Sequence, residues 1–204
     1  MRSDLRNDLI RLSAEHLSLV ASAMLIAIVV GIPLGILISR RPGAKWLLNV
    51  SGVIQTIPSL ALFGFLIPVP FIGGIGKSTV IVALVLYALL PILRNTFVGI
   101  ASVDPAVCES AIAMGMTNGQ LLRQVQLPLA ARTIIAGIRV ATVTTVGTAT
   151  IAAAIGGGGL GVFIFRGVAT VDTAQILAGA IPSALMALLA DGGLGWLERK
   201  LSPA

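Results

Sequence analysis

The sequence predicts an all-α membrane protein with five transmembrane helices in one domain over residues 1–204. Three observations predict this class. Mean hydropathy is +1.01, and only 11% of residues are charged, against about 25% in a soluble globular domain. The chain also contains five uncharged, continuously apolar stretches of 16 to 31 residues. Strands of a membrane barrel would instead alternate polar and apolar residues over about 10 positions.

Charged residues separate these stretches, and a helix needs about 20 mostly apolar residues to cross the hydrocarbon core. The predicted spans cover residues 17–38, 47–67, 78–98, 133–155 and 174–196. With the 99–132 loop in the cytoplasm, the N-terminus lies outside and the C-terminus inside. Nine Lys and Arg residues then lie inside and five outside, in agreement with the positive-inside rule. The net charge of +6 therefore reflects topology, and no nucleic-acid partner is expected.

The first span follows a segment of mixed charge and ends at Arg40 and Arg41. That segment lacks the pattern of a cleaved signal peptide, so we expect a retained span. His16 is the only histidine and is expected at the membrane interface. Cys108 is the only cysteine and is expected to be an ordinary helix residue. A multi-histidine metal site and an internal disulfide are therefore excluded.

In the second span, Pro58 cannot donate a helical hydrogen bond, which would leave the carbonyl of Ile54 free. The polar neighbours Gln55, Thr56 and Ser59 indicate either a lining or hinge of a translocation path, or contacts that hold neighbouring helices together. Both alternatives stay open.

Two features near the ends of the third span can also be interpreted. Residues 68–76 contain two prolines and three glycines and predict a turn. Arg94, near the other end of the third span, is long enough to reach the membrane interface.

The loop between the third and fourth spans contains signals for two short helices. Asp104 is a good helix N-cap, and Gly115 can adopt the left-handed conformation that ends a helix. Thr117 and Gln120 form a capping box that opens a second helix, which Pro128 is expected to stop. We therefore predict two short helices that meet at an angle near Gly115.

The fourth span places Thr142, Thr145 and Thr148 at three-residue spacing. These side chains predict either one wall of a narrow polar path or close helix packing. The following glycines, 156–159, lack the strand and helix that a phosphate-binding loop needs. We expect a flexible extracytoplasmic turn there, with Arg166 as a possible contact for a partner. In the fifth span, Asp191 is expected to face a protein partner or the interface rather than lipid.

The polar loop resembles the cytoplasmic signature of permease subunits in binding-protein-dependent ABC importers. The family pattern is Glu-Ala-Ala, three residues, Gly, nine residues, Ile, any residue, and Leu-Pro. The matching residues are Glu109, Ser110, Ala111, Gly115, Val125, Leu127 and Pro128. Ser110 replaces the usual Ala and Val125 the usual Ile, and both spacings are kept.

This resemblance implies a MetI-like ABC permease fold in which the loop is a coupling helix that sits in a cleft of an ATPase subunit. A short rigid helix transmits a rigid-body push better than a flexible loop. Glu109 can pair with a basic group of the partner, while Ala111 and Gly115 keep one face flat. The signature residues would dock the ATPase, whereas ATP and magnesium would bind to that partner and not to this chain.

Three further stretches, residues 55–68, 86–100 and 155–167, look like permeases for glycine betaine, choline, carnitine and related osmoprotectants. The resemblance implies an inner-membrane location in bacteria. It also implies three partners: an ATPase, a second permease subunit (identical or related) and an extracytoplasmic binding protein. Aromatic residues are only 4% of the chain, too few for an aromatic cage around a quaternary ammonium. Substrate selection is therefore expected mainly in the binding protein.

Other functions fit the sequence less well. A phosphate-binding GxxxxGK[ST] motif is absent from the sequence, and no carboxylate lies at the centre of a span, where ion-coupled carriers need one. An intramembrane enzyme would need a nucleophile–base pair or metal ligands within the spans. The remaining alternatives are an ABC permease for another small amino-acid-derived solute, and a passive channel or structural membrane subunit.

Overall fold

The computed structural model describes residues 2–201, and all regular structure in that range is helical. In chain order the helices are α1 (Arg2–Arg40), α2 (Trp46–Thr56), α3 (Ser59–Leu66), α4 (Lys77–Ala101), α5 (Pro105–Ala113), α6 (Asn118–Gln120), α7 (Leu127–Ala149), α8 (Gly161–Thr170) and α9 (Thr173–Lys200). A short 3-10 segment, Pro42–Lys45, precedes α2, and a second one, Ile151–Ile155, follows α7. A π-helical turn, Leu121–Gln126, joins α6 to α7.

The long helices confirm the predicted all-helical class. Four continuous helices in the described range are long and apolar enough to cross a membrane: Arg6–Arg40, Lys77–Ala101, Asn118–Ala149 and Thr173–Lys200. The predicted second span is instead a pair of helices bent by 103°. The predicted fourth span, 133–155, is displaced, because its helix starts before residue 133 and α7 ends at Ala149.

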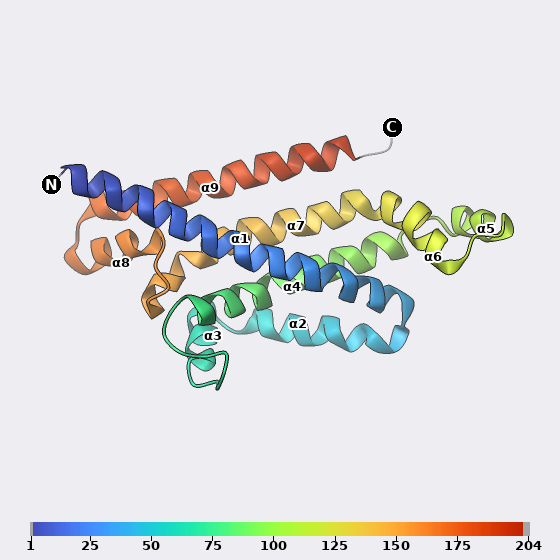
Figure 1. Cartoon of the computed structure of the whole chain (residues 1–204), viewed down its shortest axis with the longest axis horizontal. Coiled ribbons are helices and arrows are strands. Elements are labelled where there is room, and N and C mark those ends of the chain that lie inside the picture. The colour runs from blue at the N-terminus through green and yellow to red at the C-terminus, as the bar shows by residue number, and fades with distance from the viewer. Residues whose placement is uncertain (1, 202–204) are drawn as a thin grey trace.

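Figure 1 shows four helices side by side, namely α2, α4, α7 and α9, with α1 running across them. Contacts follow the order α2–α4–α7–α9, and α1 packs mainly on α4 and then on α7. The N-terminus lies at the α8 end of the molecule, whereas α5 and α6 lie at the opposite end (Figure 1). The buried core lies between α1, α4 and α7, where small and branched side chains such as Ala27, Ala88 and Ile92 have no exposed surface.

Glycines set the close approach of these helices. A Cβ at Gly35 of α1 would lie 2.5 Å from the Cβ of Thr96 on α4. A Cβ at Gly137 of α7 would lie 2.5 Å from the Cβ of Asn95 on α4. In lipid, helix association relies on such close packing, because the hydrocarbon is as apolar as the side chains themselves.

The bend between α2 and α3 lies at Pro58, as the sequence predicts, but its hydrogen bonding differs. The carbonyl of Ile54 is not free, since it accepts a 3.2 Å hydrogen bond from the backbone N–H of Ile57. Ile57 adopts an extended backbone, which is the preference of a residue that precedes proline. The Tyr87 hydroxyl donates to the carbonyl of Ile57, so α4 holds the bend in place.

The prediction that Pro128 stops a short helix is wrong. Pro128 lies in the first turn of α7, where a missing N–H is tolerated. The preceding turn widens to a π-helix, and the N–H of Leu127 donates to the carbonyl of Leu122 five residues back. This widened turn lets one helix run from Asn118 to Ala149, so the second short helix is the start of a membrane-spanning one.

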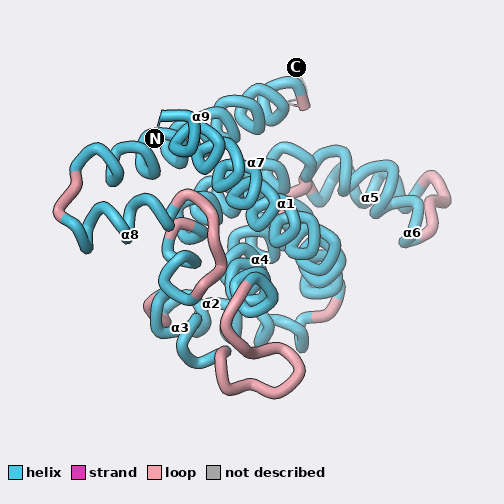
Figure 2. Tube along the Cα trace, turned by 60° about the vertical axis from the view of Figure 1, so that its left-hand side comes forward, coloured by secondary structure: helices cyan, strands magenta, loops and turns pink. Residues whose placement is uncertain are grey.

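The glycine-rich segment after α7 is a turn, and a helix that the sequence analysis missed follows it. Figure 2 shows α8 as a short helix beside this connection. Gly156, Gly158 and Gly159 have φ of 74°, 80° and 78°, a region that favours glycine. A Cβ at Gly161 would lie 1.8 Å from the carbonyl oxygen of Thr150, so only glycine fits at the start of α8.

Candidate functional site

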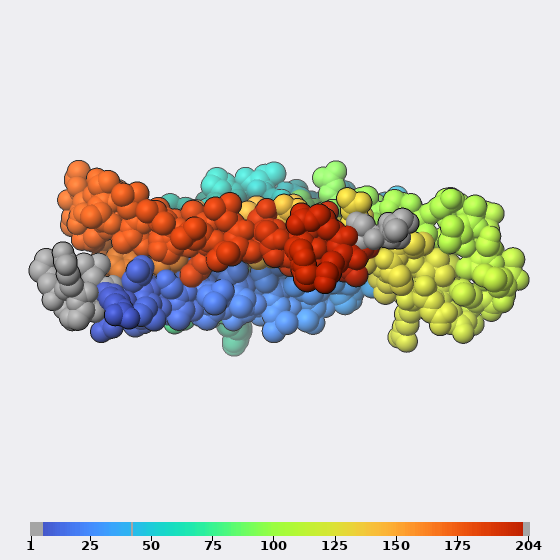
Figure 3. Space-filling model, turned by 90° about the horizontal axis from the view of Figure 1, so that it is seen from above, coloured from blue at the N-terminus to red at the C-terminus, as the bar shows by residue number. Residues whose placement is uncertain are grey.

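The loop with the importer-like signature projects as an elbow from one end of the molecule. We define the elbow as residues 104–128, which comprise α5, α6 and the π-helical turn. Seen from above in Figure 3, its green and yellow atoms form the end of the molecule beyond α9. The elbow therefore offers a surface to a partner outside the helical bundle.

Local hydrogen bonds explain why α5 begins and ends where it does. The Asp104 carboxylate accepts from the N–H of Ala106 at 2.9 Å, which confirms the predicted N-cap. At the other end, the N–H of Met116 donates to Ala111 and the N–H of Gly115 donates to Ile112, at 3.2 and 2.9 Å. This pair of bonds, with a φ of 87° at Gly115, is a Schellman motif.

The start of α6 is fixed in the same way, and its predicted capping box is confirmed. The Thr117 hydroxyl accepts from the backbone N–H of Gln120 at 3.3 Å, and the side-chain oxygen Oε1 of Gln120 accepts from the backbone N–H of Thr117 at 2.8 Å. Two short helices therefore meet at Gly115 with few free backbone donors between them. Local hydrogen bonds therefore fix both helix ends at the corner of the elbow.

The signature residues do not share one surface. Glu109 and Ser110 are exposed, and Glu109 forms no ion pair with any described residue. Ala111 is only 2% exposed, because α5 packs there against the π-helical turn. The small side chain of Ala111 lets α5 approach the rest of the elbow closely, so Ala111 does not lie on the elbow's exposed surface.

Of the remaining signature residues, Gly115 lies at the corner between α5 and α6, while Leu127 and Pro128 lie where the elbow joins the bundle. Gly115 is exposed at the tip, and Pro128 is exposed on the first turn of α7. Leu127 is half-buried and packs against a small apolar cluster of Ile100, Ala130 and Ile134. Leu127 thus attaches the elbow to α4 and α7.

Apolar residues on the outer face of the elbow were not singled out from the sequence. Val107, Ile112 and Met114 are 42%, 54% and 74% exposed. Exposed apolar groups beside a free carboxylate are typical of a protein interface rather than of a solvated helix. Their placement within an otherwise polar loop is the sequence signal that could have identified them.

The candidate path residues near Pro58 lie beside the bend. Gln55 and Thr56 are exposed, whereas Ser59 is half-buried at the start of α3. The Gln55 amide donates to the carbonyl of Tyr87 at 2.8 Å, so Gln55 holds α2 to α4. The Thr56 hydroxyl donates within its own helix to Val53 at 2.7 Å. Thr56 also lines an open groove of about 720 Å³ between α2 and α4, with Asn49 and Arg94.

The three threonines of α7 differ in their surroundings. Thr142 and Thr148 are half-buried, and each hydroxyl donates to the carbonyl four residues earlier in α7. Thr145 is 1% exposed and lies 3.6 Å from the sulfur of Met24 on α1. Thr145 therefore packs in the core, while the adjacent Thr144 is the exposed threonine of this segment.

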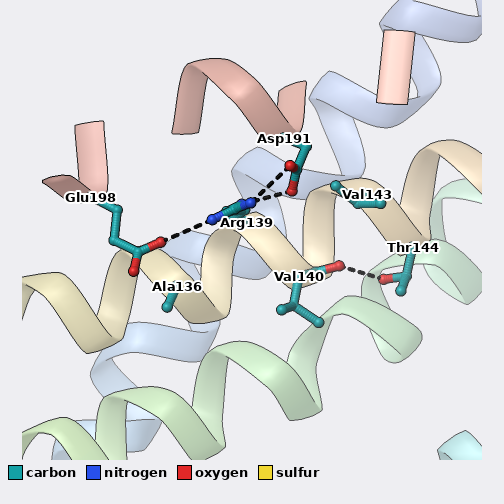
Figure 4. Close-up of a pocket in the computed structure, with 7 residues that line it drawn as sticks. All are labelled: Ala136, Arg139, Val140, Val143, Thr144, Asp191 and Glu198. Atoms are coloured by element: carbon teal, nitrogen blue, oxygen red, sulfur yellow. Dashed lines mark hydrogen bonds and ion pairs between the residues drawn. The ribbon is translucent and has the colours of Figure 1, made fainter. Parts of the chain in front are cut away.

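An ionic cluster between α7 and α9 was not predicted. Figure 4 shows Arg139 between two carboxylates of α9. Its guanidinium donates two hydrogen bonds to Asp191, at 2.6 and 2.7 Å, and one to Glu198 at 3.3 Å. Arg132 lies 3.8 Å from Glu198. Asp191 therefore pairs with a cation of its own chain, where the sequence analysis expected a partner protein or the interface.

This cluster lies beside an open hollow of about 400 Å³ whose other walls are mostly apolar. The walls are formed by Ala136, Val140, Val143 and Thr144 of α7 (Figure 4). In such surroundings a paired and doubly hydrogen-bonded guanidinium is tolerated, whereas an unpaired one is costly.

At the opposite end, α1 holds the glycine turn. His16 is fully buried within the protein. One of its ring nitrogens, Nε2, lies 3.2 Å from the carbonyl oxygen of Val146 on α7. Glu15 accepts from the N–H of Gly159 at 3.4 Å. Nearby, Arg166 lines a hollow of about 320 Å³ together with two carboxylates. Within residues 2–201, no three His, Cys, Asp or Glu side chains come together as metal ligands would.

Comparison with known proteins adds to this geometry. The family described as "Binding-protein-dependent transport system inner membrane component" matches residues 27–203. The chain is 53% identical to the glycine betaine/carnitine/choline transport system permease protein OpuCD of Bacillus subtilis, over 93% of this chain and 82% of that one. It is 50% identical to the carnitine transport permease protein OpuCD of Listeria monocytogenes, over 93% and 84%. With the osmoprotectant import permease protein OsmY of Salmonella typhimurium the identity is 44%, over 96% and 83%.

Solved structures agree in fold. The inward-facing methionine ABC transporter MetNI contains a chain that superposes with a TM-score of 0.88 at 22% identity, over 100% of both chains. A chain of an amino acid ABC transporter superposes with a TM-score of 0.79 at 19% identity, over 98% of this chain and 96% of that one. At such identities the likeness concerns the arrangement of helices, which is that of a MetI-like permease.

Proposed function

Because this chain belongs to the inner-membrane components of binding-protein-dependent transport systems, we propose that it carries a quaternary-ammonium osmoprotectant across the bacterial inner membrane. Glycine betaine, choline and carnitine are the solutes named for its relatives. The observation that supports this proposal is the 53% identity over 93% of the chain to a relative named for all three.

The chain is the multi-pass, non-catalytic permease of an ABC transporter, and ATP hydrolysis takes place on a partner ATPase. A binding protein supplies the solute in systems of this kind. We propose that two permease chains, identical or related, enclose the path between them. One chain alone shows open grooves rather than a closed channel, which supports that arrangement.

The elbow is proposed as the element that docks in the ATPase. Three features support this role: the free carboxylate of Glu109, the exposed apolar side chains Ile112 and Met114, and the continuous helix from Asn118 into the membrane-spanning α7. When ATP closes the ATPase pair, the two elbows of the dimer would move together. Rigid-body rotation of the attached helices would then open the path outward, and hydrolysis would reset it.

The path is proposed along the polar surface near the α2–α3 bend and the exposed side of α7. Gln55 and Thr56, with Ser59 beside them, would form one wall. Thr142 and Thr148 would lie near the opposite wall, with Thr145 packed behind them. Polar groups at membrane depth are expected to face protein or water rather than lipid.

We further propose that the elbow and the C-terminus lie in the cytoplasm and the N-terminus outside. The end of α9 lies toward the elbow, and the N-terminus lies at the opposite end (Figure 1). The excess of Lys and Arg on the elbow side supports this orientation.

Uptake by the reconstituted transporter tests the proposed solute. The chain would be placed in liposomes with its ATPase, and the binding protein and labelled glycine betaine added outside. We expect ATP-dependent accumulation that unlabelled carnitine or choline reduces, while methionine does not. Competition by methionine alone would favour another amino-acid-derived solute. Equal flux with and without ATP would indicate a passive channel.

A further inference from the structure

We propose that Arg40 is a positioning residue that joins α1 to the elbow, so that movement of the elbow is passed to the first transmembrane helix. This inference rests on the proposed function, because it assigns a part within the coupling step. Arg40 is the last residue of α1, and it lies outside the signature of the elbow.

The Arg40 side chain makes two hydrogen bonds to distant parts of the chain. Its Nη2 donates to the side-chain oxygen of Gln126 at 2.9 Å and to the backbone carbonyl of Asn118 at 3.2 Å. Asn118 begins the second helical part of the elbow, and Gln126 ends the π-helical turn. One guanidinium thus spans both ends of that part of the elbow.

The contact continues to α5. The side-chain amide of Gln126 donates toward the sulfur of Cys108 at 3.7 Å, and Cys108 lies next to Glu109 on the proposed docking helix. A chain of polar contacts therefore runs from α1 through the π-helical turn to α5. Its middle member, Gln126, occupies the position that the importer pattern leaves open to any residue.

Apolar packing lies beneath this polar chain. Ile36, one turn before Arg40, packs with Leu122 and Leu127 around the small cluster of Ile100, Ala130 and Ile134. The end of α1 is therefore held to the elbow by an apolar contact and by the guanidinium above it.

The two routes out of the elbow differ in kind. A push on α6 reaches α7 through continuous helical backbone, since one helix runs from Asn118 to Ala149, and α5 joins that helix through the turn at Gly115. No backbone link of this kind joins the elbow to α1. Ile36 and Arg40 join α1 directly to the elbow, whereas the rest of α1 packs on α4 and α7. Directional hydrogen bonds fix the end of α1 more closely than apolar packing alone.

Arginine suits this place better than lysine. A guanidinium presents several donors in a fixed plane, whereas a lysine ammonium is a compact charge on a flexible stem. The neighbouring Arg41 is also exposed, yet its side chain forms no hydrogen bond or ion pair with another described residue. Arg41 therefore provides a matched control for the effect of charge alone.

The test measures solute transported per ATP hydrolysed in the complete reconstituted complex. We expect Arg40→Lys and Arg40→Gln each to assemble with the ATPase and hydrolyse ATP, while transport per ATP falls about threefold, as expected for loss of an exposed charge-assisted hydrogen bond. Arg41→Gln should match the unsubstituted complex. Gln126→Leu leaves Arg40 and its bond to the Asn118 carbonyl in place, so it should give a smaller loss, and adding Arg40→Gln to it should lower transport only to the level of Arg40→Gln alone.

Each other outcome overturns the proposal. Normal transport per ATP with Arg40→Lys would show that only the charge matters. Loss of the ATPase from Arg40→Gln in mild detergent would make Arg40 a docking contact. Unchanged transport per ATP in Gln126→Leu would contradict the proposed link between Arg40 and the elbow, even if the Arg40 variants failed to insert into the membrane. If the unsubstituted complex itself transports no osmoprotectant, the proposed function fails instead.

Discussion

At the scale of single residues, Glu109 and Arg139 are charged side chains in opposite situations. Glu109 stands exposed on α5 with no ion-pair partner in the described part of the chain, while Arg139 is bound by two carboxylates of α9. A free charge on a projecting helix is available to a partner, whereas a paired charge is committed to its own fold. Different consequences follow when each is changed.

Glu109→Lys should leave the protein inserted but lower ATP-driven uptake by about tenfold or more, because a lysine would face the basic group that Glu109 is proposed to meet. Uptake and co-purification of the ATPase would be measured side by side. Glu109→Gln, which removes the charge without reversing it, should lose less. Normal uptake by Glu109→Lys would remove Glu109 from the mechanism.

Asp191→Asn should lower the Tm of the detergent-solubilised chain by about 2 to 4 °C, because it breaks a doubly hydrogen-bonded ion pair between α7 and α9. Arg139→Gln should lower the Tm further, since it removes the hydrogen bonds to both Asp191 and Glu198 and leaves Asp191 without its cation. Glu109→Gln serves as the control with no partner to lose and should leave the Tm unchanged. Equal Tm values for all three variants would contradict this role of the cluster.

The sequence allowed the local contacts of these residues to be predicted, but not the distant ones. The caps at Asp104 and Thr117 depend on residues two or three positions away, so their patterns are readable. The pair of Arg139 with Asp191 joins residues 52 positions apart, and that of Arg40 with Gln126 joins residues 86 apart. Such pairs depend on how the helices are arranged, which no local pattern specifies.

At the scale of elements, prolines and glycines decide where the helices break. Pro58 follows a residue in extended conformation and separates α2 from α3. Pro128 instead lies in the first turn of α7, directly after a π-helical turn, and the helix continues through it. The two prolines look alike in the sequence, and the difference lies in the hydrogen bonds of the preceding turn. The boundaries of the second and fourth spans were therefore the least predictable parts of the fold.

Gly161→Ala should destabilise the start of α8, because the new Cβ would lie 1.8 Å from the carbonyl oxygen of Thr150, and backbone must shift to admit it. Overpacking of this kind costs about 1 to 3 kcal/mol, which thermal unfolding in detergent would detect. Gly192→Ala on α9 is the control, since a Cβ there meets nothing within 4 Å. It should stabilise by roughly 0.5 to 1 kcal/mol through helix propensity. A Gly161→Ala variant as stable as Gly192→Ala would contradict the packing described for α8.

At the scale of the whole molecule, the helices form a body with the elbow at one end and, at the other, a glycine turn that hydrogen-bonds to α1 through Glu15. Composition and the length of the apolar stretches were sufficient to predict the all-helical class, and the helix-capping residues Asp104, Gly115 and Thr117 predicted the elbow. They did not predict α8, because ten residues of moderate apolarity beside a glycine run resemble a loop. They also did not predict which polar groups face outward, since the neighbours Thr144 and Thr145 differ, the first exposed and the second buried in the core.

The central claim is that the elbow lies in the cytoplasm and is covered by the ATPase. It is tested by labelling Met114→Cys, in a chain that also carries Cys108→Ser, with a membrane-impermeant maleimide. Met114 is 74% exposed at the tip of the elbow, so a cysteine there should react in inverted membrane vesicles stripped of ATPase. It should not react in right-side-out vesicles, and rebinding the ATPase should protect it. Labelling from the outside, or equal labelling with and without the bound ATPase, would contradict the account.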